Sequence, residues 1–307
     1  MMMPALRASS GPRTAVRFFE TTFRTPLMAW MLIAIVCSLG FSATLRWSQH
    51  ARGSMRVAAS VNYIMAAGVY VVIFVTMRPD VDPAVIAIGA MTGVLYICNL
   101  FLFAAVMKRI GIVLTGAIMS LAVVVPVAVS IAFGDPWRDK AAGLVVALVA
   151  LPILASARAS HRGEPIAHGI RRWLWVTLLF FAAGMEGTLL KLASEVGDAS
   201  YQWTFLPALF LTAAIISTPV MLRAPLRAAT RWDVLRGALL GGCNVVANFA
   251  MTIALLQLPG PLLFPMRHVG GVMGTALLGW LLWHERLGRR AVIGLILCAV
   301  AAVLLTW

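Results

Sequence analysis

The chain has 307 residues, of which 61% are hydrophobic and only 12% are charged, and its formal net charge is +14. Its mean hydropathy is +0.92. A soluble globular chain is nearer half apolar and a quarter charged, so this composition excludes that class. The positive charge does not indicate a nucleic-acid partner, because nearly every Lys and Arg lies in a short turn between apolar segments, where basic residues anchor helices at lipid headgroups.

The apolar residues fall into ten spans, most of which reach the ~20 residues that a helix needs to cross ~30 Å of hydrocarbon. They lack the alternation of barrel strands, and a backbone in lipid must satisfy its hydrogen bonds internally, so we predict helices. The approximate limits are Pro26–Trp47, Met55–Met77, Pro83–Met107, Gly111–Phe133, Lys140–Ser156, Arg172–Leu192, Tyr201–Leu222, Asp233–Leu256, Gly260–Trp283 and Arg290–Trp307. The sequence thus predicts an all-α integral membrane protein, a multi-pass protein of the cytoplasmic membrane that is anchored from its first span onward.

Residues 1–25 precede the first span and are basic. As a helix they would carry charged side chains on one face and apolar side chains on the other, namely Arg13, Arg17, Glu20 and Arg24 opposite Val16, Phe19 and Phe23. That pattern is typical of an interfacial helix on an anionic leaflet, which is normally the cytoplasmic one. A disordered basic tail accounts for the same residues equally well.

The two halves of the chain repeat the same order of features about 150 residues apart. In each half the third span begins with two glycines four residues apart, Gly89 and Gly93 or Gly237 and Gly241. We predict two five-helix repeats, residues 26–157 and 172–307, joined by a linker at 158–171. Because five is odd, the second repeat must cross the bilayer inverted relative to the first, as in many secondary transporters.

The basic residues of the loops are unevenly distributed between the two membrane faces. The N-terminus and the even-numbered loops carry seven of them, and the odd-numbered loops carry sixteen. The positive-inside rule therefore predicts that both termini face outward. The basic segment at 1–25 indicates the reverse, so the orientation stays open.

Two turns at equivalent places carry an acidic residue followed by a glycine that opens the next span. They are GDPWRDKAAG, with Asp135 and Gly143, and HERLGRRAVIG, with Glu285 and Gly294. The spans before these turns each contain a proline, Pro126 or Pro265. In these features the chain resembles the ten-helix members of the drug/metabolite transporter superfamily. The resemblance implies export of a metabolite or amino acid, with both termini in the cytoplasm.

Charged residues inside apolar spans are the default functional candidates of a membrane protein. Glu186 lies about seven residues before the end of the sixth span, and Arg267 about seven residues after the start of the ninth, so both are expected ~10 Å from the same face. His268 is one step deeper. Glu186 and Arg267 therefore form either a structural ion pair or a site for binding and coupling, and we expect them to face one another across the protein interior.

Amide and phenol side chains form two further stripes. Asn244 and Asn248 continue the glycine stripe of the eighth span, where they are expected to line a polar cavity. Tyr96 and Asn99 form the comparable stripe of the third span, and Asn99 is expected nearer the opposite membrane face from Glu186. Together with Glu186, Arg267 and His268, these four residues are the predicted site for substrate binding or coupling.

No metal site, cofactor or catalytic residue is predicted. The four cysteines (Cys37, Cys98, Cys243 and Cys298) lie in different spans without metal-ligand spacing, so we expect small packing residues. Lys191, near the end of the sixth span, is expected to reach the headgroups or to pair with Glu195.

The combined features favour a secondary transporter, an exporter of a small polar metabolite such as an amino acid, that works by alternating access and is coupled to protons. Arg267, Asn244 and Asn248 would bind a carboxylate, while Glu186 would bind an amine or carry the coupling proton, with His268 as a relay. The expected partners are a small molecule, membrane lipids and protons, in a monomer or homodimer. The alternatives are a lipid or lipid-linked flippase on the same fold and a membrane-embedded transferase, which would need clustered His, Asp or Glu residues.

Overall fold

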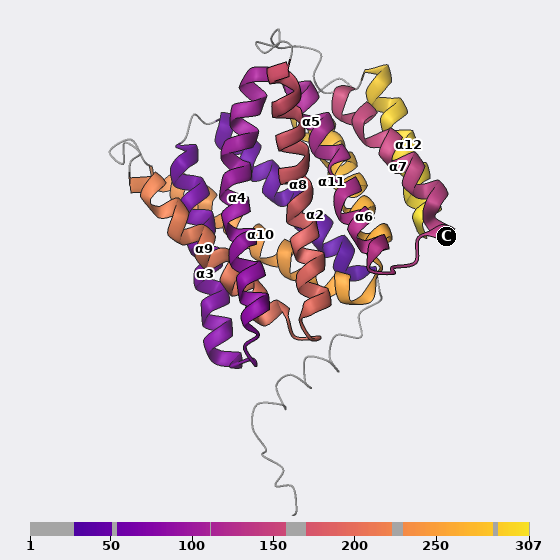
Figure 1. Cartoon of the computed structure of the whole chain (residues 1–307). Helices are drawn as coiled ribbons and strands as arrows, with labels where there is room; N and C mark the ends of the chain where they lie inside the picture. Colours follow the sequence, from indigo (N-terminus) through magenta and orange to yellow (C-terminus); the bar gives the residue numbers. More distant parts are fainter. Residues whose placement is uncertain are drawn as a thin grey trace, which may run out of the picture.

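The structure, a computed structural model, describes residues 28–50, 54–110, 112–157, 170–222, 230–284 and 288–306. Throughout these ranges the regular structure is helical, without a strand (Figure 1). The basic segment 1–25, linker residues 158–169 and Glu285 lie outside the described residues, so those predictions stay predictions. The all-α class is confirmed.

Each of the ten predicted spans contains a helix, and one span is divided in two. The helices are α2 (Ala29–His50), α3 (Met55–Met77), α4 (Pro83–Ile110), α5 (Ile112–Leu121), α6 (Val124–Ala132), α7 (Ala141–Ala157), α8 (Ile170–Val196), α9 (Gln202–Leu222), α10 (Arg231–Gln257), α11 (Gly260–Trp283) and α12 (Arg289–Thr306). A short 3-10 helix, η1 (Arg138–Lys140), precedes α7.

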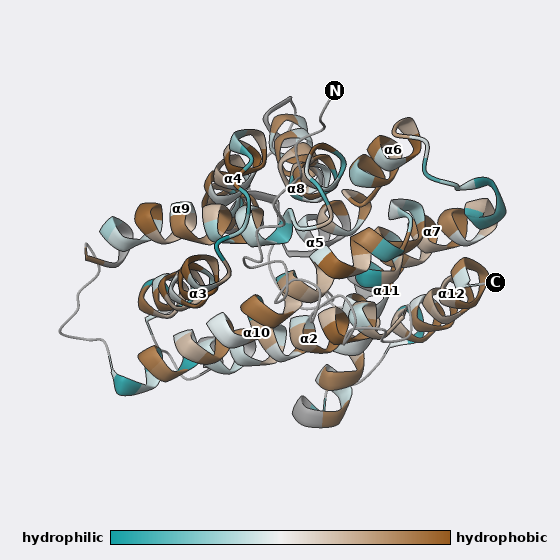
Figure 2. Ribbon diagram, turned by 90° about the horizontal axis from the view of Figure 1, so that it is seen from below, coloured by the Kyte–Doolittle hydropathy of each residue, from teal (hydrophilic) through white to brown (hydrophobic). Residues whose placement is uncertain are grey.

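Among the described residues, five helices are long and apolar enough to cross a membrane, and they indicate a membrane protein. They are Arg56–Met77, Pro83–Phe103, Trp173–Val196, Arg231–Gln257 and Arg289–Thr306. Large apolar side chains face outward on them, for example Val72 and Leu174, which are 66% and 63% exposed. In Figure 2 the helices are mainly brown, and hydrophilic residues are concentrated at connections such as the one between α6 and α7. Lipid would cover such an apolar exterior.

The predicted glycine pairs are points of close helix contact. A Cβ added at Gly93 of α4 would lie 2.3 Å from the carbonyl oxygen of Leu209 in α9. A Cβ at Gly237 of α10 would lie 2.8 Å from the carbonyl oxygen of Ala58 in α3. These distances leave no room for a side chain, so both helix pairs depend on glycine for their separation.

The main helix contacts are the same in the two halves of the chain. If each of the first five spans is replaced by the corresponding one of the second five, and the reverse, the same contacts result. α10 packs against α2 and α3, and α4 packs against α8 and α9, which are the corresponding helices. Likewise α6 packs against α8 and α11 against α2, while α7 and α12 pack against each other (Figure 1). The two halves are therefore interleaved.

Proline explains why the fourth span is divided. Pro126 has no N–H to donate to the carbonyl of Ala122, and its ring crowds that carbonyl. The α-helix is interrupted at Ala122 and Val123, where Val125 N–H instead donates to Ala122 O at 3.1 Å. By contrast, α11 runs without interruption through Pro265.

The two ends of the bundle carry different sets of helix ends. The terminal face is the end at which α6, α8 and α12 end and α7 and α11 begin. Gly143 at the start of α7 lies against Leu304 and Leu305 at the end of α12, and Asp135 after α6 contacts both Lys191 of α8 and Gly260 of α11. The opposite face is the other end of the bundle.

Candidate functional site

Glu186 is held by an amide from the other half of the chain. It projects from the middle of α8, is half-buried, and accepts a hydrogen bond of 2.6 Å from Asn99 Nδ2 of α4. The same Nδ2 donates to the carbonyl of Ala182, one turn earlier in α8, at 2.9 Å. Asn99 is buried, and among the residues that the structure describes its Oδ1 has no hydrogen-bond partner. A buried orphan oxygen beside a carboxylate is costly and marks the position as one where a ligand or water can bind.

A second set of polar side chains forms a continuous hydrogen-bonded chain across three helices. The Tyr96 hydroxyl of α4 donates to Asn248 Oδ1 of α10 at 2.9 Å. Asn248 Nδ2 donates to Asn244 Oδ1 at 2.7 Å, and Asn244 Nδ2 donates to Asn62 Oδ1 of α3 at 3.2 Å. We call these four residues the amide chain. Because Tyr96 is one turn from Asn99, the amide chain adjoins the Glu186–Asn99 bond.

Arg267 of α11 supplies the remaining charge of the site, and His268 follows it on the same helix. Both are half-buried. In the part of the chain that the structure describes, Arg267 does not lie within the 4.0 Å of an ion pair with Glu186. It lies within electrostatic range of the Glu186 carboxylate. The guanidinium is thus near the carboxylate without closing on it, which leaves its donors available for an anionic group.

The structure therefore joins residues that the sequence placed at two levels. Asn99 was expected nearer the opposite face from Glu186, and that expectation was wrong, since the two side chains touch. The reason lies in the length of α8, which continues to Val196 instead of ending at about Leu192. Glu186 is consequently ten residues from the helix end, or ~15 Å at 1.5 Å per residue, close to the middle of a bilayer.

Tyr63 belongs to the same neighbourhood and was missed by the sequence analysis. It is buried in α3, next to Asn62 in sequence, and lies within electrostatic range of Glu186. A lone tyrosine among apolar residues gives no signal of its own. Only its position beside Asn62, a member of the amide chain, could have marked it.

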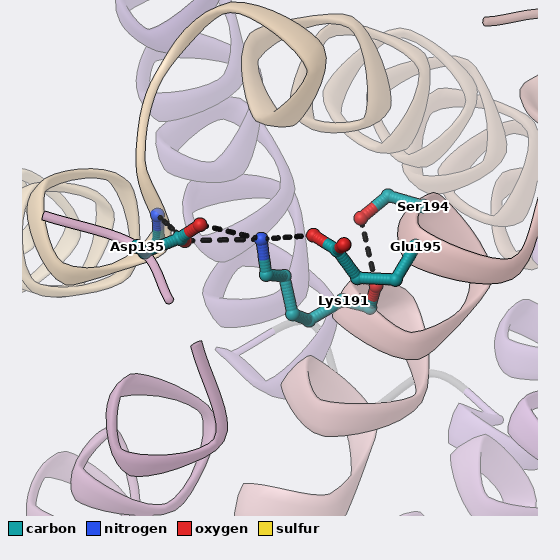
Figure 3. Close-up of polar contacts among 5 residues, drawn as sticks. Asp135, Lys191, Ser194 and Glu195 are labelled. Atoms are coloured by element: carbon teal, nitrogen blue, oxygen red, sulfur yellow. Dashed lines mark hydrogen bonds and ion pairs between the residues drawn. The ribbon is translucent and has the colours of Figure 1, made fainter. Parts of the chain in front are cut away.

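Nearer the terminal face lies a separate ionic cluster (Figure 3). Lys191 of α8 is buried and lies between two carboxylates, Asp135 after α6 at 3.0 Å and Glu195 one turn later in α8. The second Asp135 oxygen accepts a hydrogen bond of 2.8 Å from the N–H of Gly260, the first residue of α11. The expected pairing of Lys191 with Glu195 is confirmed, while its burial and its bond to Asp135 were not foreseen.

A further buried ion pair, at the start of α10, has a structural explanation. Asp233 Oδ2 accepts hydrogen bonds from the backbone N–H and hydroxyl of Thr230, and Asp233 Oδ1 accepts from the N–H of Ser54 and from Arg236. This carboxylate caps its own helix and fastens the start of α3 to it. Its hydrogen bonds to the protein are complete, so it is not part of the candidate site.

The described residues contain no group of three or more His, Cys, Asp or Glu side chains that could hold a metal ion. The cysteines are free, and only Cys298 is fully buried, whereas Cys98 is exposed and Cys37 and Cys243 are half-buried. Cys298 is therefore a buried packing residue, as expected, and the other three cysteines are not fully buried.

Comparison with known proteins informs the fold alone. No protein family model and no curated protein matches the sequence. Solved structures do resemble it: one crystal structure superposes with a TM-score of 0.72 at 16% sequence identity, covering 91% of this chain and 98% of that one. Since nearly all of both chains is aligned, this helix arrangement exists in a solved protein.

Proposed function

We propose that this protein is a secondary transporter of a small polar metabolite such as an amino acid, an exporter that works by alternating access in the cytoplasmic membrane. In this proposal its ten membrane-spanning segments form two inverted five-helix repeats, as in the drug/metabolite transporter superfamily that the acidic turns resemble. The matched helix contacts of the two halves support the repeat. Five spans per half would give the halves opposite directions through the bilayer.

The single observation that carries the function is the half-buried Glu186 beside Asn99, with Arg267 near but not paired. Charge near the middle of a membrane-length helix is costly and is retained where it binds or moves something. A purely structural ion pair would instead be closed, with the desolvated charges in contact. An open pair of opposite charges, lined by amides, suits a ligand that carries both charges.

The proposed binding mode uses the groups that have donors or acceptors to spare. Arg267 binds the carboxylate of the substrate, because a guanidinium presents two parallel donors to such a group. Asn244 binds through the one amide hydrogen that the amide chain leaves free, while Asn248 donates both of its amide hydrogens to Asn244 and holds it in place. Glu186 binds the amine or, in its absence, a proton, with His268 as a relay. Substrate and proton then compete for one carboxylate, which couples their movements.

The test is transport by the purified protein in proteoliposomes. Uptake of a pool of radiolabelled amino acids is compared with movement of a fluorescent lipid between leaflets, in the same vesicles and in protein-free ones. We expect amino-acid counterflow without lipid movement. Lipid movement without amino-acid counterflow would assign the fold to a flippase and overturn the proposal.

A further inference from the structure

The cluster of Asp135, Lys191 and Glu195 joins parts of the chain that an alternating-access transporter must separate. Asp135 belongs to the first half, whereas Lys191 and Gly260, which it binds, belong to the second. We propose that the Asp135–Lys191 bond is a latch that holds the terminal face closed, and that opening of this face requires Asp135 to leave. The inference rests on the proposed transport function.

Burial along α11 shows that the terminal face is the closed one. Every residue of the first six, Gly260 to Pro265, is buried. From Met266 to Thr275 all residues except Val269 are half-buried, and this stretch includes Arg267 and His268. The charged groups of the site are therefore shielded on the terminal side and less enclosed on the other.

Next to the latch, α6 and α11 are in tight contact, and this contact closes the terminal face. A Cβ added at Gly260 would lie 2.0 Å from Ser130 Oγ, so only glycine permits this approach. α8 closes the third side, because a Cβ at Gly187 would lie 2.9 Å from Cγ of Pro126. The half of the fourth span that follows the Pro126 break thus packs against both α8 and α11, and Asp135 is attached just beyond it.

The arrangement of charges makes the latch reversible. Glu195 is four residues after Lys191 on α8, so it stays beside the ammonium whichever way α6 moves. When Asp135 departs, Lys191 keeps one counter-charge and gains water. The usual penalty for breaking a buried pair, an isolated charge in a low dielectric, is largely avoided. Asp135 also releases the Gly260 N–H, which frees the first turn of α11 to move in the same step.

The experiment measures opening directly, without reference to transport. Ser130→Cys is introduced after the four native cysteines are replaced, and the protein is reconstituted in nanodiscs, where both faces are accessible. The rate of labelling by a charged maleimide reports exposure of a position that is 0% exposed in the closed state. The latch is then removed by Asp135→Asn, which retains an acceptor for Gly260 N–H, or by Lys191→Met. Asp139→Asn is the matched control, an exposed acid four residues from Asp135.

We expect slow labelling of the reporter alone and of the Asp139→Asn control, and labelling faster by about tenfold or more in both latch variants. Equal rates in all four proteins, whether slow or fast, would overturn the latch. Size-exclusion profiles establish that the variants are folded, and Asp135→Asn, which is nearly isosteric, serves if Lys191→Met does not fold. Failure of amino-acid counterflow with normal latch behaviour would instead count against the proposed function.

Discussion

Asn99 and Glu186, which lie 87 positions apart and in different halves of the chain, meet through a hydrogen bond of 2.6 Å. The bond couples α4 to α8 at the depth of the candidate site. Both donors of the Asn99 amide are used, one by Glu186 and one by the Ala182 carbonyl, so the amide fixes the carboxylate and the helix that carries it together.

Replacing Asn99 with leucine should therefore lower the stability of the fold, because the buried side of the Glu186 carboxylate loses its hydrogen-bond donor. Asn99→Leu leaves Glu186 without its donor, and we expect a loss of about 1–2 kcal/mol in the free energy of unfolding, measured as a lower melting temperature in detergent. The double variant Asn99→Leu/Glu186→Leu should recover most of the loss, because it removes both polar partners. Equal destabilisation of the single and double variants would show that packing, not the hydrogen bond, matters here.

The glycines at the helix crossings give a sharper stability test. Gly93→Ala forces a Cβ to within 2.3 Å of a backbone carbonyl that cannot move aside, and we expect destabilisation by about 1–3 kcal/mol. Gly68→Ala is the control, since nothing lies within 4 Å of its Cβ, and alanine there should stabilise α3 by about 0.5–1 kcal/mol. Thermal unfolding of the two variants should shift in opposite directions, and a shift of the same sign would refute the crossing geometry.

The break in the fourth span leads to a prediction about motion. Pro126→Ala restores the missing N–H to the Ala122 carbonyl and should join α5 and α6 into one helix, since an interior proline costs ~3 kcal/mol. We expect a higher melting temperature together with slower transport, because the segment that carries the latch can no longer move separately. Pro152→Ala, inside α7, is the matched control and should leave transport unchanged. Identical transport rates for both variants would contradict a role for the break.

The sequence was sufficient for the all-helical fold class and for the positions of the ten helical segments because their signals are local. Span length, glycine pairs and a proline each act within one or two turns of helix, so these features could be recognised in the sequence. The side-chain contacts between spans were harder to predict. Depth estimates from helix ends carry an error of several residues. An error of four residues at the end of α8 was enough to give Glu186 and Asn99 different expected depths.

Which side chains of neighbouring helices meet also depends on how each helix is rotated about its own axis, and hydropathy does not reveal that rotation. Lys191 was assigned its neighbour Glu195 because the two are four residues apart on one helix. Its second partner, Asp135, lies 56 positions away and required the packing of α6 against α8. The same limit hid Tyr63, which follows Asn62 on α3 and comes near the site because α3 packs against α10.

Arg267 is the residue through which the substrate carboxylate would be recognised. Arg267→Lys keeps the charge but loses the planar pair of donors, and we expect transport to fall by at least about tenfold while the melting temperature changes little. Arg138→Lys, at an exposed position in η1, is the control for replacing an arginine with a lysine. If Arg267→Lys transports like the control, the guanidinium does not bind a carboxylate.

If Glu186 couples substrate movement to protons, counterflow in proteoliposomes must respond to an imposed pH gradient. Wild-type protein should accumulate labelled amino acids when the gradient is imposed and should lose that accumulation when a protonophore collapses it. Glu186→Gln keeps the shape of the side chain and an acceptor for Asn99, but it cannot ionise, so its residual transport should be indifferent to the gradient. A Glu186→Gln protein that transports at the wild-type rate and still responds to the gradient would show that Glu186 does not carry the coupling proton.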